Sequence, residues 1–288
     1  MCATVSVLIA LLSACAWSLF DVKRKQLVQQ VAPLPLTFWL SLSVIPFYLV
    51  LSGVALALSP DASLPASGYW WPALGSLLVS TMAAVSFVQA LKVGQMAGLM
   101  PVLALTPVIS ALLSVWWLAD ELSARQWGAM SAIVVLLFWL QGGARFRWQA
   151  GTGFMLLVAL GWGTGTVFDK CALAYAEPLQ HALLQSSGMM LLVALVIFVR
   201  GERQQLSFHR LPLFALMTAA LVFIVAVSAQ LFALQSLHAG IIETIKRSIG
   251  IVGGLFWGAY LFGETVSRQQ QRLVALLVAA IAWLMWPV

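Results

Sequence analysis

The sequence predicts an all-α integral membrane protein with ten transmembrane helices, arranged as two inverted repeats of five. Three observations predict this fold: the composition, the number of apolar segments, and the residues that recur between the two halves. Of the 288 residues, 62% are hydrophobic and only 8% are charged, against roughly 25% charged residues in a soluble domain. A water-soluble fold of this size could not cover its surface with so few charged side chains.

The apolar segments follow one another along the whole chain. Clusters of charged, polar and proline residues separate ten of them, each close to the roughly 20 residues that cross a bilayer as a helix. The first five lie near residues 3 to 22, 34 to 58, 70 to 91, 97 to 119 and 126 to 142. The second five lie near residues 153 to 173, 179 to 199, 211 to 236, 239 to 262 and 270 to 287.

The two halves of the chain are related by a repeat. Several residues of the first half recur in the second half in the same order. At an offset of 145 residues, Trp17 and Lys25 match Trp162 and Lys170, and Pro33-Leu34 matches Pro178-Leu179. At an offset of 143 residues, Ala90-Leu91 matches Ala233-Leu234, and Glu121 matches Glu264. We therefore divide the protein into a first repeat over residues 1–145 and a second over residues 146–288. Because five crossings are an odd number, the second repeat enters the membrane from the opposite side, as in many transporters.

Basic residues lie mainly in the loops after odd-numbered helices. These loops hold Lys23, Arg24, Lys25, Lys92, Arg145, Arg147, Arg200, Arg203, Arg210, Arg268 and Arg272, whereas the loops after even-numbered helices hold only Arg125 and Lys170. Because basic loops favour the cytoplasm, we expect both termini to be non-cytoplasmic, in a multi-pass protein of a cell membrane such as a bacterial inner membrane. The net charge of +6 therefore reflects topology, and no nucleic acid partner is expected.

The first apolar segment is expected to remain in the protein as a helix. No Lys or Arg precedes it, and Lys23, Arg24 and Lys25 follow it, which is the reverse of the charge order of a signal peptide.

Short motifs occur in a fixed order along nearly the whole chain. They are Trp17 to Lys25 at the end of the first helix, Ala90-Leu91-Lys92-Val93-Gly94 before the fourth, Leu105-Thr106-Pro107 within it, Glu121 closing it, and Trp162 to Lys170 and Leu261-Phe262-Gly263-Glu264 in the second half. As an ordered set they resemble the drug/metabolite transporter superfamily, and within it the EamA-type transporters. The resemblance implies a transporter, with export of amino acids or related metabolites.

A narrower resemblance lies in the ninth predicted helix, where Leu237-His238-Ala239 is followed by Lys246-Arg247. This phrase is similar to the phosphate and nucleotide-sugar translocator branch of the same superfamily, in which a Lys-Arg pair at this place binds the anionic group of the substrate. At 1.5 Å per residue, both side chains would lie roughly 10 to 12 Å below the membrane boundary. An intramembrane charge costs about 2.5 to 3.5 kcal/mol near a helix centre and usually faces a cavity or a partner.

Two interpretations of this basic pair are open. In the first, Lys246 and Arg247 bind the carboxylate or phosphate of a small-molecule substrate, with Arg247 making a planar two-pronged contact. In the second they belong to a structural ion cluster, because Glu243 lies three and four residues before them on the same helix face. Even in the second interpretation, one cation would remain unpaired. Glu243 is also a candidate to take up a coupling proton.

Matching aromatic and basic residues end the first helix of each repeat. Trp17 with Lys25, and Trp162 with Lys170, either line a cavity as substrate-binding residues or anchor the helix ends at the membrane interface, where Trp and Lys are frequent. Both interpretations remain open from the sequence.

Other polar residues in the sequence have structural interpretations. Asp21 and Asp169 lie close before a lysine, and we expect each to pair with it, with a role in proton relay as the alternative. Two serines are each followed three residues later by a glutamine, the pattern of capping boxes that would start the fifth and tenth helices: Ser123 with Gln126, and Ser267 with Gln270.

The sequence favours a secondary transporter of a small anionic or zwitterionic metabolite, such as an amino acid, an organic acid or a phosphorylated compound. It would act as an exporter or exchanger by alternating access, in the lipid bilayer, as a monomer or homodimer. A proton or a counter-substrate would drive it, since the sequence contains no nucleotide-binding loop. The alternative is a cationic drug exporter, which the 13 tryptophans favour but which would need a lone carboxylate in an aromatic cavity. A membrane enzyme or a non-transporting scaffold is a third hypothesis.

No cofactor or metal is expected. The three cysteines show no paired spacing, and His181, His209 and His238 lie at no metal-ligand spacing and are expected to supply ordinary loop or interface polarity. An enzyme should show a cluster of His, Asp or Glu at one membrane depth. The sequence shows none, so enzymatic activity is not expected.

The orientation can be tested with a reporter enzyme that works only in the cytoplasm. We expect it to be inactive when fused after Val288 and active when fused after Gln30, behind the first helix alone, because the basic loops define the cytoplasmic side. Measuring reporter activity in whole cells decides the question, and cytoplasmic activity of the fusion after Val288 would overturn the predicted orientation.

Overall fold

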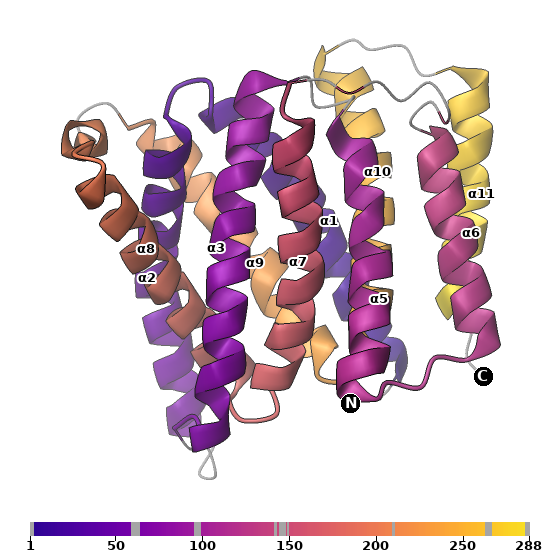
Figure 1. Cartoon of the computed structure of the whole chain (residues 1–288), viewed down its shortest axis with the longest axis horizontal. Coiled ribbons are helices and arrows are strands. Elements are labelled where there is room, and N and C mark those ends of the chain that lie inside the picture. Colours follow the sequence, from indigo (N-terminus) through magenta and orange to yellow (C-terminus); the bar gives the residue numbers. More distant parts are fainter. Residues whose placement is uncertain are drawn as a thin grey trace.

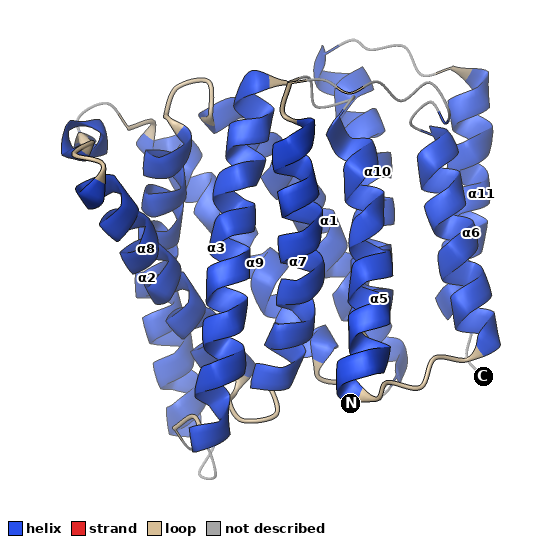
Figure 2. Ribbon diagram, viewed as in Figure 1, coloured by secondary structure: helices blue, strands red, loops and turns tan. Residues whose placement is uncertain are grey.

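The computed structural model describes residues 3–58, 64–94, 99–140, 143, 148, 150–208, 211–262 and 267–285. Within these residues it contains ten α-helices and no β-strand (Figure 1, Figure 2), which confirms the all-α prediction. The first half holds α1 (Ala3–Leu27), α2 (Pro33–Leu58), α3 (Trp70–Val93), α5 (Leu105–Leu118) and α6 (Ala124–Leu140). The second half holds α7 (Thr152–Ala172), α8 (Pro178–Val199), α9 (Leu213–Leu234), α10 (Ala239–Phe262) and α11 (Arg268–Met285). Short 3₁₀ helices are η1 (Ser67–Tyr69), η2 (Met100–Ala104) and η4 (Arg203–Leu206).

Several of these helices have the length and apolarity of membrane spans. Among the described residues, five helices are long and apolar enough to cross a membrane: Val5–Leu27, Pro33–Leu58, Ser67–Val93, Pro178–Val199 and Leu213–Leu234. Val102–Leu118 and Ala124–Leu140 form shorter apolar helices. The other helices, α7, α10 and α11, mix apolar residues with polar or charged ones. In α10 the charged residues are buried inside the bundle.

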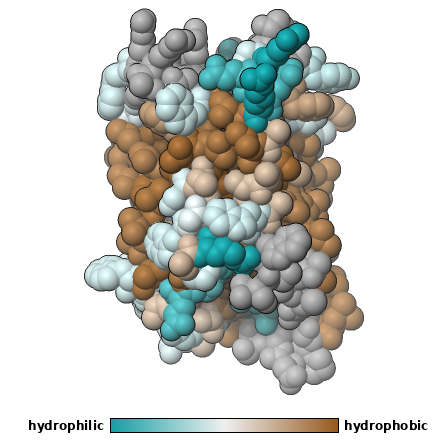
Figure 3. All heavy atoms as spheres, turned by 90° about the vertical axis from the view of Figure 1, so that its right-hand side faces the viewer, coloured by the Kyte–Doolittle hydropathy of each residue, from teal (hydrophilic) through white to brown (hydrophobic). Residues whose placement is uncertain are grey.

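The outer surface of the bundle is strongly apolar. Leu8, Trp116 and Phe214 are 60%, 80% and 86% exposed. Figure 3 shows hydrophobic side chains across most of one face, with hydrophilic groups at its upper edge and in its lower half. A surface of this kind suits lipid rather than water.

The two repeats run through the bundle in opposite directions. In Figure 1, α1 rises from the lower edge and α7 descends from the upper edge. A backbone hydrogen bond of 3.0 Å from Ala66 N to Tyr175 O ties the start of α3 to the end of α7, so these two helices are antiparallel neighbours. α1 packs along α9 in the same manner. Each first helix therefore packs against the third helix of the other repeat, as an inverted pair of repeats requires.

Glycines in α7 allow α3 to approach closely. A Cβ atom added to Gly161 would lie 2.7 Å from the carbonyl oxygen of Val79 and 2.8 Å from the Cβ of Ala83. A Cβ atom added to Gly165 would lie 2.7 Å from the hydroxyl of Ser80. Small residues permit such backbone contacts between membrane helices, where van der Waals packing drives association. This contact brings the end of α7 close to α3 and α8, where part of the cavity described below lies.

Both predicted capping boxes are confirmed. Ser123 N donates to Gln126 Oε1 at 2.8 Å, and Gln126 N donates to Ser123 Oγ at 3.3 Å. The second box repeats this pattern, with Ser267 N to Gln270 Oε1 at 2.9 Å and Gln270 N to Ser267 Oγ at 3.2 Å. They satisfy backbone N–H groups at the starts of α6 and α11, the last helix of each repeat.

We expect Gly161→Leu to destabilise the bundle by about 1 to 3 kcal/mol, because the added side chain must push α3 away from α7. Thermal unfolding of the purified protein in detergent measures the effect. Gly153→Leu is the matched control, since Gly153 lies in the same helix and a Cβ atom there meets nothing within 4 Å. Equal unfolding midpoints for the two variants would contradict the close contact.

Candidate functional site

A cavity of about 150 Å³ lies inside the bundle and is lined by both repeats. That volume matches a cavity that holds a molecule the size of benzene, so the space suits a small metabolite. Its walls come from α1, α2 and α3 of the first repeat and from α7, α8, α9 and α10 of the second. Helices α5, α6 and α11 do not reach it among the described residues.

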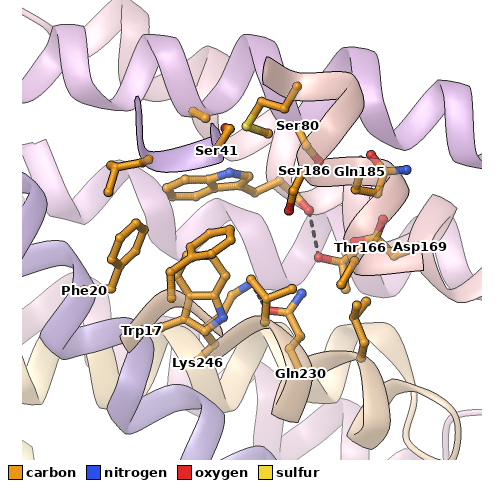
Figure 4. Close-up of a pocket in the computed structure, with 18 of the residues that line it drawn as sticks. Trp17, Phe20, Ser41, Ser80, Thr166, Asp169, Gln185, Ser186, Gln230 and Lys246 are labelled. Atoms are coloured by element: carbon orange, nitrogen blue, oxygen red, sulfur yellow. Dashed lines mark hydrogen bonds between the residues drawn. The ribbon is translucent and has the colours of Figure 1, made fainter. Parts of the chain in front are cut away.

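The cavity has an aromatic side and a polar side. Figure 4 shows Trp17 and Phe20 together on one side and Asp169 with Gln185 on the other, while Lys246 lies between them. A molecule in this space would therefore meet aromatic rings at one end and hydrogen-bonding groups at the other.

The charged cluster of α10 lies at the wall of this cavity. Lys246 and Arg247 are 8% and 7% exposed and both line the space, while Glu243 is 0% exposed and lies behind them. Lys246 forms an ion pair with Glu243, and Arg247 Nε lies 3.4 Å from Glu243 Oε2. The two cations therefore share one carboxylate, and the cluster carries one positive charge in excess.

Neighbouring helices complete the hydrogen bonds of this cluster. Thr166 of α7 donates to Glu243 Oε1 at 2.8 Å, and Lys246 Nζ donates to Gln230 Oε1 of α9 at 3.0 Å. Charges buried in a membrane protein require such partners. The packing of α7, α9 and α10 is thus tied to the position of one carboxylate.

The matching tryptophans of the two repeats cover the two cations. Lys246 Nζ lies 5.3 Å from the ring centroid of Trp17, and the guanidinium carbon of Arg247 lies 4.7 Å from that of Trp162. Both rings line the cavity. Cations at these distances from an indole are attracted by its negative face, so each repeat contributes one aromatic residue to the α10 cluster.

Arg24 is a cavity residue that the sequence analysis assigned to a loop. It is 4% exposed, forms an ion pair with Asp21 and lies 4.2 Å from the ring centroid of Phe87. Helix α1 continues to Leu27, beyond the predicted end near residue 22, and so carries Arg24 inside the bundle. Its spacing of three and four residues from Asp21 and Phe20 indicates the shared helix face.

Asp169 lies on the polar side of the cavity with two hydrogen-bonding partners. His181 Nε2 lies 3.1 Å from Asp169 Oδ1, and Ser76 donates to the same oxygen. His181 Nδ1 lies 2.9 Å from the hydroxyl of Tyr69. The expected pairing of Asp169 with the adjacent Lys170 is wrong, because Asp169 contacts His181 of α8 and Lys170 contacts Asp120, just after the end of α5. His181 is 1% exposed, so its expected role in loop or interface polarity is also wrong.

The two repeats place opposite charges at corresponding positions. The offset of 145 residues that relates Trp17 to Trp162 also relates Arg24 to Asp169. Both side chains line the cavity. Asp21 likewise differs from the expectation, since its partner is Arg24 rather than the neighbouring lysine.

The two matching lysines do not line the cavity. Lys170 Nζ lies 3.1 Å from both carboxylate oxygens of Asp120, and His238 Nδ1 lies 3.2 Å from Asp120 Oδ2. These contacts join the ends of α5 and α7 to the start of α10. Lys25 is half-buried near the end of α1 and is likewise absent from the cavity wall.

The structure thus brings together five of the seven predicted site residues: Trp17, Trp162, Lys246 and Arg247 at the wall, and Glu243 behind it. Their binding of a substrate stays a prediction. In the described part of the chain, no group of three or more His, Cys, Asp or Glu side chains could hold a metal ion.

These features define a membrane protein of two inverted repeats around a shared, charge-lined cavity. The model of the EamA-like transporter family matches the chain twice, over residues 4–141 and again over residues 149–286. The protein therefore belongs to the EamA-like transporter family, and it is a multi-pass membrane transporter of the drug/metabolite type.

A solved structure shares this fold. The chain is similar to a protein whose title reads only "Crystal structure of protein", with a TM-score of 0.71, 16% sequence identity, and coverage of 96% of this chain and 94% of that one. No curated protein gives a significant match.

The ion pair of Arg24 with Asp21 can be tested through stability. We expect Arg24→Met to destabilise the protein by about 1 to 3 kcal/mol, because it leaves the partly buried carboxylate of Asp21 without its charged partner. Replacing both residues, as Arg24→Met with Asp21→Leu, should recover part of that loss. Unfolding in detergent measures each variant, with Lys23→Met as the control for charge. A double variant less stable than Arg24→Met would contradict the pairing.

Proposed function

We propose that the protein is a secondary transporter that exports or exchanges a small zwitterionic or anionic metabolite by alternating access. The observation that carries the proposal is that one cavity contains both a cluster with excess positive charge and, apart from it, a carboxylate without a Lys or Arg partner among the described residues. Lys246 and Arg247 share the single carboxylate of Glu243, whereas Asp169 is held by hydroxyl and imidazole groups. One part of the cavity wall therefore has an excess of positive charge, and another part carries a carboxylate.

This arrangement favours a zwitterion within the broader class of substrates. A substrate carboxylate would bind at Lys246 and Arg247, where Arg247 offers a planar donor pair and Lys246 a mobile point charge. A substrate ammonium group would bind at Asp169. An amino acid is the simplest metabolite with both groups, and the rings of Trp17 and Phe20 offer a surface for its side chain.

A purely anionic substrate would use the α10 cluster alone. It would then face the carboxylate of Asp169 without a counter-charge, unless Asp169 binds a proton. Organic acids and phosphorylated compounds are therefore less complementary to the whole cavity than amino acids are, although they share its cationic wall.

Export of organic cations is the second candidate, and one observation favours it. Asp169 is a cavity carboxylate without a Lys or Arg partner among the described residues, and tryptophans line the same space. Lys246 and Arg247 oppose this alternative, because a cationic drug would have to enter beside two positive side chains.

We further propose that the upper edge of the bundle in Figure 1 faces the cytoplasm of a cell membrane. The chain positions of Lys92, Arg200, Arg203, Arg268 and Arg272 place them at this edge. Arg24 lies in the cavity rather than in a loop, but the other basic residues at this edge still outnumber those at the lower edge. The positive-inside rule then puts both termini on the non-cytoplasmic side.

Transport by proteoliposomes tests the proposed function. We expect the wild type to take up labelled amino acids from a mixed panel that also holds organic acids, sugar phosphates and organic cations. Lys246→Ala and Arg247→Ala should each lower amino acid uptake about tenfold or more, since a charged hydrogen bond contributes about 1.5 to 3 kcal/mol.

The matched control is Lys92→Ala, which removes one positive charge at the exposed end of α3. It should transport like the wild type. Equal uptake by the wild type and both α10 variants would remove the proposed binding site, and preferential uptake of organic cations would favour the second candidate.

A further inference from the structure

Three ionisable side chains from three different elements form a continuous hydrogen-bonded chain that ends in the cavity. Tyr69 lies in η1 at the start of α3, His181 in the first turn of α8, and Asp169 in the last turn of α7. The Tyr69 hydroxyl lies 2.9 Å from His181 Nδ1, and His181 Nε2 lies 3.1 Å from Asp169 Oδ1. Tyr69 and His181 are each 1% exposed and the side chain of Asp169 is 16% exposed; both His181 and Asp169 line the cavity.

This chain keeps complete hydrogen bonds in two protonation states. With Asp169 ionised, Tyr69 donates to Nδ1 of a neutral imidazole, and Nε2–H donates to the carboxylate. With Asp169 protonated on Oδ2, Oδ1 is the carbonyl oxygen and still accepts from His181 Nε2–H and from the Ser76 hydroxyl, while Tyr69 still donates to Nδ1. Both states use the same contacts, so the chain accommodates one extra proton without leaving a buried group unpaired.

Glu243 is less suited to bind a proton. It is 0% exposed and is contacted by Lys246, Arg247 and Thr166. Protonation would leave two buried cations without a counter-charge, which is strongly destabilising. The sequence singled out Glu243 as the candidate for a coupling proton, but the contacts favour Asp169.

We propose that Asp169, supported by His181 and Tyr69, is the proton-binding site that couples substrate movement to proton movement. This inference rests on the proposed transport of a zwitterion, since the substrate ammonium group and the proton would compete for one carboxylate. Binding of one then requires release of the other. The protein would exchange one proton for each substrate molecule.

The proton balance of the exchange is simple. A proton reaches Asp169 Oδ2 from the water of the cavity when the cavity opens to the non-cytoplasmic side. Asp169 gains it as a neutral carboxylic acid, and Tyr69 and His181 keep their own protons and hydrogen bonds. When the cavity opens to the other side, the arriving ammonium group displaces this proton from Asp169 into the water of the cavity.

Few charged side chains surround Asp169 in the described part of the chain. Lys246 of α10 is within electrostatic reach of it, and the adjacent Lys170 is paired with Asp120 at the end of α5. Tyr69 and His181 face it from η1 and α8, and α3 contributes the neutral Ser76. Helices α2 and α9 contain no charged residue. The proton therefore competes mainly with Lys246 and with the substrate.

Proton binding can be measured without any substrate. Infrared difference spectra of the purified protein, recorded between alkaline and mildly acidic buffer, should show the carbonyl band of a protonated carboxylic acid. Asp169→Asn should abolish the band from this site, and Glu177→Gln should retain it. Glu177 is exposed at the start of the same α8 that carries His181, so this control removes one carboxylate nearby. A spectrum unchanged in Asp169→Asn overturns the proposal.

Transport provides the second measurement. In proteoliposomes with the labelled amino acid panel, the apparent KM of the wild type should fall as pH rises, by up to about tenfold per pH unit, because proton and substrate compete for one carboxylate. Asp169→Asn should show a higher KM that does not change with pH, and Glu177→Gln should behave like the wild type. A wild-type KM that is independent of pH overturns proton coupling and leaves the transport function intact. Amino acid uptake that is absent at every pH, together with an infrared band that Asp169→Asn removes, overturns the substrate class and supports the proton site.

Discussion

One buried carboxylate, shared by two cations, is the interaction on which the interior of this bundle depends. Glu243, Lys246 and Arg247 follow one another on a single face of α10, so the helix itself keeps their charges close together. Thr166 of α7 and Gln230 of α9 supply further hydrogen bonds, and Trp17 and Trp162 cover the cations. Because such charges are costly in a membrane unless partnered, the helices around α10 are held where their polar and aromatic groups can reach it.

The same constraint explains why the two repeats, although similar in outline, are not equivalent inside the cavity. At the offset of 143 residues that relates Glu121 to Glu264, Lys246 and Arg247 correspond to Leu103 and Ala104. The first repeat therefore contributes apolar packing from η2, just before α5, where the second repeat contributes charge from α10. The scaffold of the bundle is nearly symmetric, and the glycines of α7 let it pack closely against α3. The site is not symmetric, because its excess positive charge comes from the second repeat.

The sequence predicts most of the fold because the relevant patterns are local. Apolar runs, capping boxes and recurring anchors can be found without knowing which helices meet, and a Lys-Arg pair inside an apolar run is conspicuous. The site is predicted less well. Arg24 follows an apolar run and resembles a loop cation until α1 is seen to continue past it. Lys170 finds Asp120 fifty residues away in the chain, and Asp169 finds His181 on the next helix. Such pairings depend on tertiary contacts that spacing alone does not specify.

The correspondence of Arg24 with Asp169 has a consequence for the direction of flux. If the repeats exchange conformations during a cycle, the two scaffolds exchange their positions, but an arginine then takes the place of an aspartate at the cavity wall. The inward-facing and outward-facing forms therefore present different potentials to the same molecule and bind it with unequal strength. Equal and opposite substrate gradients would produce unequal fluxes, so the carrier would act as a rectifier.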